Sequence, residues 1–211
     1  GVFLKDFSTS TLVSLPVPQH FDGDINYLDN IGNISTKSVT AIKHDNSILP
    51  SFPNSVSSVT AYKIEDDGSL NYMGNAISEK NSEYEVIYDF TLTQNIIVDD
   101  SSFALVGVSV RMVAKVKTKV SGINLASIEG LGVAVDHKKV SGSLEVRVNG
   151  ISSERINAQI PVTTDLSPAS ISNALQSVAI IKSHIYDNDT KITPLFLAVS
   201  QGIGSGSPKL Q

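Results

Sequence analysis

The chain has 211 residues and a formal net charge of −5, with 41% hydrophobic residues, 18% charged residues and no cysteine. This composition is typical of a folded globular protein and is too apolar for a disordered chain. The missing cysteine excludes disulfides, thiolate metal sites and cysteine nucleophiles. No run approaches the roughly 18 consecutive apolar residues of a membrane-spanning helix.

The lack of cysteine does not fix the compartment. Cysteine-free β chains rich in Ser, Thr and Asn are common among bacterial surface proteins and viral coat proteins. We therefore expect an extracytoplasmic location, secreted or surface-exposed, or a place in a virion. A chain of this length can bury a sizeable core without crosslinks, so we expect one generous domain.

Charge is unevenly distributed along the chain. Residues 1–100 carry 14 acidic and 5 basic residues, whereas residues 101–211 carry 7 and 11. Opposite net charges in two parts of a molecule can guide head-to-tail self-association. The alternative is that two parts of one sheet system happen to differ, because halves of a sequence need not be halves of a structure.

Residues 1–55 are weakly patterned. Pro16 and Pro18 in STLVSLPVPQ lack the backbone N–H that a central strand donates. Pro50 and Pro53 in ILPSFPNS lack this donor as well. We therefore expect an irregular N-terminal segment of edge strands and loops that belongs to the same domain as the rest of the chain.

From residue 56 the pattern becomes regular and predicts antiparallel strands. In VTAYKIEDDGSLNYMG, a three-residue loop 66–68 pairs Ile64 with Leu70 and places Gly68 where such loops need a positive φ. In EYEVIYDFTLT, strict alternation predicts a half-buried strand. Its apolar face consists of Tyr84, Val86, Tyr88, Phe90 and Leu92.

The longest alternating stretch is FALVGVSVRMVAKVKTKV, residues 103–120, with one face largely of valines. Its opposite face carries Arg111, Lys115, Lys117 and Lys119. A solvated sheet face explains this pattern, since lysines also discourage edge-to-edge aggregation. The alternatives are contact with an anionic polymer or lipid head groups, and contact between copies or membrane insertion. Nucleic acid is not expected, because the face lacks interleaved aromatic residues.

The next segment mixes turn and strand signals. The alternation breaks around INLASIEG, we expect a turn at GLGVAV, and alternation resumes in KKVSGSLEVRVNGISSERINAQIPV. Asn149-Gly150 suits a two-residue turn, but register favours a hairpin with a three-residue loop 148–150.

The period then changes to that of a helix in LSPASISNALQSVAIIKSHIYDN, which predicts a helix over about residues 168–186. Ser167 suits the N-cap and Pro168 the first helical position. The expected buried stripe is Ile171, Ala174, Leu175, Val178, Ile181 and Ile185.

These elements predict a mainly β fold of antiparallel, sandwich-like sheets, with one long C-terminal α-helix packed on a sheet. The predicted organisation is an N-terminal segment 1–55, a β-rich core 56–200 with the helix near its end, and a flexible tail 201–211.

Motifs for catalysis and cofactor binding are missing. The chain has no G-x-S-x-G, and GLGVAV and GIGSG lack the strand–glycine–helix context of a dinucleotide site. His20, His44, His137 and His184 show no metal-binding spacing. We therefore name no catalytic or cofactor-binding residue and expect no cofactor.

One segment partly resembles a calcium-binding loop. In HFDGDINYLDNIGN, Asp22, Asp24 and Asn26 have the spacing of the first three oxygen ligands. However, Tyr27 stands where the turn glycine belongs and Asn33 where a bidentate Glu is needed. Calcium is thus a candidate ligand of these three residues, and an acidic turn is the alternative.

The sequence favours association over catalysis, since it supplies extended β edges, uneven charge and a cationic strand face. We expect a non-enzymatic extracytoplasmic binding or assembly module whose partner is a protein or a second copy. One alternative is a viral coat or spike subunit released from a polyprotein, because Gly1 and the terminal Leu-Gln fit the two sides of a 3C-like protease cut. Another is an enzyme with a dispersed active site.

Overall fold

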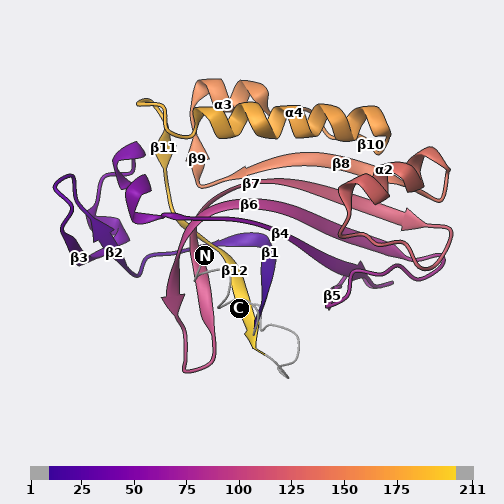
Figure 1. Cartoon of the computed structure of the whole chain (residues 1–211), viewed down its shortest axis with the longest axis horizontal. Helices are drawn as coiled ribbons and strands as arrows, with labels where there is room; N and C mark the ends of the chain where they lie inside the picture. Colours follow the sequence, from indigo (N-terminus) through magenta and orange to yellow (C-terminus); the bar gives the residue numbers. More distant parts are fainter. Residues whose placement is uncertain (1–9, 203–211) are drawn as a thin grey trace.

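The structure is a computed structural model that describes residues 10–202 (Figure 1). It is mainly β and its sheets are antiparallel, as predicted. The largest sheet contains β1 (Ser10–His20), β4 (Asn54–Ile64), β5 (Leu70–Met73), β6 (Glu83–Ile97), β7 (Phe103–Thr118), β8 (Val140–Asn149), β10 (Thr164–Asp165) and β12 (Leu195–Gly202). Residues 1–9 of the predicted N-terminal segment and 203–211 of the predicted tail lie outside the described residues.

Two small sheets accompany the large one. They pair β2 (Asp24–Leu28) with β3 (Ile34–Ser38), and β9 (Ile151–Ser152) with β11 (Lys191–Ile192). Two 3-10 helices, η2 (Val39–Ala41) and η3 (Asn46–Ser51), follow β3. The sandwich-like prediction is therefore met only in its coarser form, a mainly β fold with antiparallel sheets.

Strand β7 is the branch point of the large sheet (Figure 1). It pairs with β6 along its whole length. On its other side it pairs first with β12, up to Gly107, and then with β8, from Ser109 onward. The sheet therefore forks where β7 changes partner.

The predicted register of the hairpin around the loop 66–68 is confirmed. Ile64 pairs with Leu70 and Tyr62 with Tyr72, and Gly68 in the loop between them has a φ of +84°. The predicted apolar faces of β6 and β7 both enter the main core, with Phe90 partly buried at its margin.

Within residues 10–202, three α-helices cover the core face of the sheet, namely α2 (Ile128–Asp136), α3 (Glu154–Gln159) and α4 (Pro168–His184). The predicted C-terminal helix is α4, which lies over β8 and β7 and ends two residues earlier than expected (Figure 1). Its N-terminus is a capping box: Ser167 Oγ accepts from the N–H of Ser170, and Ser170 Oγ accepts from that of Ser167. No helix within residues 10–202 is long and apolar enough to cross a membrane.

The turn predicted at GLGVAV is wrong, because this segment forms α2. Ser127 caps the helix by accepting from the N–H of Gly130 at 2.9 Å, and Leu131 is buried. A Cβ on Gly132 would lie 3.9 Å from Ile171 of α4, an ordinary van der Waals distance, so this side of α2 faces α4. This packing outweighs the roughly 1 kcal/mol that each glycine costs a helix.

The hairpin predicted around 148–150 is also wrong. After Gly150, whose φ is +78°, the chain leaves β8, and β9 pairs with β11 instead. Ser153 then caps α3 by accepting from the N–H of Ile156. The alternating pattern of SERINAQI therefore belongs to a short helix.

The opposite face of the sheet is partly covered by β1. Val13 of β1 packs with Tyr62, Ile87 and Val113 in a second, smaller core. β1 is an edge strand, as predicted, and its pairing with β12 shifts register between Ser14 and Gln19, across Pro16 and Pro18. The prolines thus lie in an irregular stretch, where a missing N–H interrupts no regular pairing.

The apolar stripe of α4 is buried along its midline, from one end of the helix to the other, but not at its lateral margin. Ile171, Ala174, Ile181 and Ile185 are buried and Val178 is partly buried in the core. Leu175 is 43% exposed, so its predicted burial is wrong. The reason is its position about 100° around the helix from Ala174, at the margin of the stripe.

Two truncations in α4 should therefore differ strongly. We expect Ile181→Ala to lower the free energy of unfolding by about 2–5 kcal/mol, because it leaves a cavity at a fully buried site. Leu175→Ala should cost less than about 1 kcal/mol, because half-exposed atoms leave no closed cavity. Urea denaturation measures both, and equal losses would contradict this description of the helix.

Candidate functional site

The cationic face predicted on residues 103–120 faces a row of carboxylates. The register of β6 and β7 places three of its cations directly opposite acidic residues. These pairs are Arg111 with Asp89, Lys115 with Glu85, and Lys117 with Glu83. Side chains directly opposite on antiparallel strands have Cβ atoms about 4.5–5.5 Å apart, so opposite charges attract. The face is therefore a set of paired charge rows and not a uniformly positive surface.

The first pair of these rows is buried inside the molecule. Arg111 Nη2 donates to Asp89 Oδ2 at 2.7 Å, and neither side chain has exposed area. Arg111 Nη1 also donates to the carbonyl of Leu15 at 2.7 Å, and Ser14 Oγ donates to Asp89 Oδ2 at 2.8 Å. Burial raises the pKa of the Asp89 carboxyl, and the Arg111 guanidinium opposes that shift. Arg111 thus lies beneath the surface that Lys115, Lys117 and Lys119 share.

Ser14 ties β1 across this buried pair. Its N–H donates to Thr60 Oγ1 at 3.0 Å, and the hydroxyl of Tyr62 donates to its carbonyl at 2.8 Å. Burial raises the pKa of Tyr62, so its hydroxyl stays a donor at neutral pH. No buried side-chain nitrogen or oxygen within residues 10–202 lacks a hydrogen-bond partner. The pair therefore serves to hold β1 on the sheet.

The exposed end of the charge rows continues into a group of lysines. Lys117 Nζ lies 3.4 Å from Glu83 Oε1, and the backbone N–H of Lys119 donates to the carbonyl of Lys139 at 2.9 Å. This bond brings Lys138-Lys139, which the sequence analysis did not select, next to the predicted face. Lys117, Lys119, Lys138 and Lys139 are all exposed and are called the lysine cluster below. In the described part of the chain, only Lys117 of these four has an ion-pair partner.

The candidate calcium ligands lie along an extended segment. Asp22 precedes β2, and Asp24 and Asn26 are exposed residues of that strand. The side chain of Gln94 bonds both the N–H and the carbonyl of Asn26 at 3.0 Å. No three His, Cys, Asp or Glu side chains in residues 10–202 lie close enough together to hold a metal ion. Calcium binding by these three residues stays a prediction from spacing.

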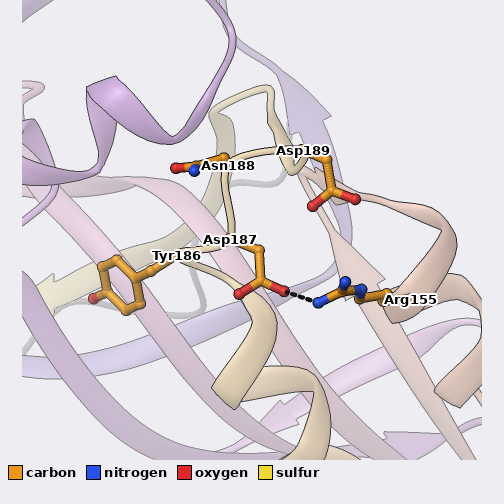
Figure 2. A pocket seen from close by; sticks show the side chains of 5 residues that line it. All are labelled: Arg155, Tyr186, Asp187, Asn188 and Asp189. Atoms are coloured by element: carbon orange, nitrogen blue, oxygen red, sulfur yellow. Dashed lines mark ion pairs between the residues drawn. The ribbon is translucent and has the colours of Figure 1, made fainter.

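A second candidate site lies where α4 ends. Here an open depression of about 480 Å³ is lined by Arg155, Tyr186, Asp187, Asn188 and Asp189 (Figure 2). We call it the α4-end pocket. Arg155 comes from α3, and the other four residues form the turn that follows α4.

The carboxylate of Asp187 is the centre of the α4-end pocket. Its Oδ2 atom lies 2.8 Å from His184 Nδ1. The same atom lies 3.5 Å from Arg155 Nη1, and Figure 2 shows this ion pair. On the adjacent side, Asn46 Nδ2 donates to the carbonyl of Tyr186 at 3.0 Å and to Asn188 Oδ1 at 3.2 Å. Contacts from α4, α3 and η3 thus hold the turn in place.

None of the five lining residues was predicted. Alternation in the sequence places Arg155 in a strand, and the N-glycosylation sequon Asn188-Asp189-Thr190 in the turn after the helix does not indicate a pocket. A short N-cap signal at Ser153 could have indicated α3, but nothing in the spacing indicates that α3 reaches the end of α4.

No protein family, curated protein or solved structure matches this chain.

Proposed function

We propose that this chain is a non-enzymatic binding or assembly module that engages an acidic protein surface, including that of a second copy, through the lysine cluster. The observation that supports this most directly is the backbone bond from Lys119 to Lys139, which gathers four exposed lysines at the end of the sheet beside α2 (Figure 1). Three of them have no carboxylate partner in the described residues, so their charges are available to a partner. Such charges raise association rates and confer salt dependence.

The environment of the histidines also favours binding over catalysis. Nucleophilic catalysis needs a hydroxyl or thiol beside an oriented base. Within residues 10–202, His44 bonds a backbone carbonyl and His184 bonds Asp187, and neither ring is hydrogen-bonded to a hydroxyl. Asp187 is shared with Arg155, and His184 itself does not line the α4-end pocket. The extracytoplasmic location and the coat-protein alternative stay predictions from the sequence.

The lysine cluster predicts a salt-sensitive association. We expect the native chain to self-associate as its concentration rises, and to do so less at high salt because exposed charges are screened. Lys119→Glu/Lys139→Glu should weaken this association by roughly tenfold or more, since like charges then oppose the acidic partner surface. Sedimentation at rising concentration and two salt levels measures both effects.

A matched control separates the cluster from net charge alone. Lys37→Glu/Lys43→Glu makes the same change in charge at exposed lysines near β3, at the far end of the molecule from α2 (Figure 1). This variant should associate like the native chain. Equal weakening in both variants would discard the cluster. A chain that is monomeric under all conditions, and whose partners bind Lys119→Glu/Lys139→Glu as they bind the native chain, would discard it too. Binding only to anionic vesicles or heparin, lost in Lys119→Glu/Lys139→Glu, would replace the acidic protein partner with an anionic lipid or polymer.

A further inference from the structure

The α4-end pocket leaves several polar groups without a partner. Among the described residues, the Asp189 carboxylate and Asn188 Nδ2 have no hydrogen-bond partner, and Arg155 engages only one of its nitrogens. Tyr186 beside them is 62% exposed. The depression therefore combines free donors, free acceptors and an aromatic ring on one patch of surface.

Hydrogen bonds from neighbouring buried and backbone groups fix the arrangement of these pocket residues. Asp187 lies between Tyr186 and Asn188 on one side and Asp189 and Arg155 on the other (Figure 2). The next residue, Thr190, is buried and donates its hydroxyl to the carbonyl of His184 at 3.0 Å. Together with the bonds from Asn46, this anchors both ends of the turn, so a ligand would meet a surface that needs little ordering.

We propose that the α4-end pocket binds a neutral saccharide, with the apolar face of a sugar ring on Tyr186 and sugar hydroxyls bonded to Asn188, Asp189 and Arg155. Sugar hydroxyls donate and accept at once, which matches an amide, a carboxylate and a guanidinium placed side by side. The C–H face of a sugar ring matches an exposed tyrosine, whose ring is apolar while its hydroxyl is polar. The volume of about 480 Å³ falls among ordinary small-molecule sites, and its open shape suits the end of a longer glycan.

Other ligand classes fit less well. Two carboxylates and the C-terminal end of α4, with its partial negative charge, disfavour an anionic ligand. Arg155 disfavours a cationic one, and its partner Asp187 is already shared with His184. An apolar ligand would leave the free polar groups of Asn188 and Asp189 without water or partner, which costs free energy.

This inference rests on the chain being a binding module, but it concerns a site separate from the lysine cluster. The probe is a panel of neutral disaccharides containing glucose, galactose, mannose and N-acetylglucosamine. It is added to the full chain made in a host without N-glycosylation, because Asn188-Asp189-Thr190 is a glycosylation sequon. We expect saturation-transfer NMR to detect at least one of them. Tyr186→Ala should weaken that binding by roughly tenfold, and Asp189→Asn by a similar factor.

Two controls make the assignment specific. Tyr186→Phe keeps the aromatic face and should retain most of the binding, whereas Asp66→Asn changes an exposed carboxylate in the β4–β5 loop and should have no effect. The proposal is overturned if no disaccharide of the panel binds, or if binding survives both Tyr186→Ala and Asp189→Asn. Self-association that persists in these variants would leave the function proposed for the lysine cluster intact while the saccharide site fails.

Discussion

Replacing Arg111 with methionine should lower the free energy of unfolding by about 3–5 kcal/mol at neutral pH, because it leaves the Asp89 carboxylate buried without its counter-ion. Methionine keeps much of the length of the arginine side chain but supplies neither charge nor donor. The carbonyl of Leu15 loses its donor at the same time, so β1 is less firmly held on the sheet. Urea denaturation of the native chain and the variant measures the loss.

The loss should shrink as pH falls. Burial already raises the pKa of Asp89 above its ordinary value of 3.8, and Arg111 is the largest influence that lowers it again. Without Arg111 the folded protein holds a proton on Asp89 at pH values where the unfolded chain has released it. Protonation of Asp89 therefore favours the folded state of the variant. Its stability rises as pH falls through the pKa of Asp89 in the folded protein toward the pKa of Asp89 in the unfolded chain. A deficit that grows on acidification would contradict this account.

Two comparison variants isolate the buried charge. Asp89→Leu/Arg111→Met removes both ions and should recover most of the loss, because a buried pair is often replaceable by apolar side chains. Lys117→Met removes the cation of an exposed pair in the same charge rows and should cost less than about 1 kcal/mol. An Arg111→Met loss no larger than that of Lys117→Met would show that the buried pair contributes nothing of its own.

Arg111 and Lys117 lie on the same face of the same strand, yet Arg111 is buried and Lys117 is exposed to solvent. The difference arises because another part of the fold covers Arg111. Alternation in residues 103–120 correctly predicts that they share a face. It does not predict which part of that face is covered, because the cover is β1, almost a hundred residues away in sequence. Two apolar residues in the sequence could have indicated the covered part of this face. Val113 lies between the cations of β7, and Ile87 lies between the acidic residues of β6. Apolar residues on an otherwise polar strand face indicate local burial.

The sequence predicts local structure correctly where residues within one short segment determine its conformation. The loop 66–68 follows from register and from Gly68, and the start of α4 follows from Ser167 and Pro168. The sequence does not predict helix α2, because its two glycines have low helix propensity, whereas in the fold Ser127 caps the helix and Leu131 is buried in the core. The α4-end pocket was missed because it joins α3, the turn after α4 and Asn46, which no spacing rule connects.

The fork in the sheet gives the other large expected effect. Gly107 lies where β7 exchanges β12 for β8, and a Cβ there would be 1.9 Å from the carbonyl oxygen of Leu92 and 2.9 Å from Thr93 Cα. Both neighbours are backbone atoms of β6, so relief requires separating two paired strands.

We therefore expect Gly107→Ala to lower the free energy of unfolding by about 3 kcal/mol or more, beyond the usual range for an added methyl group. Gly74→Ala is the matched control, since nothing lies within 4 Å of its added Cβ, and it should be nearly neutral. Urea denaturation of both variants decides the matter. If the two were equally stable, β6 and β7 could not be as close at the fork as the structure has them, because no side-chain movement can accommodate a Cβ against that backbone.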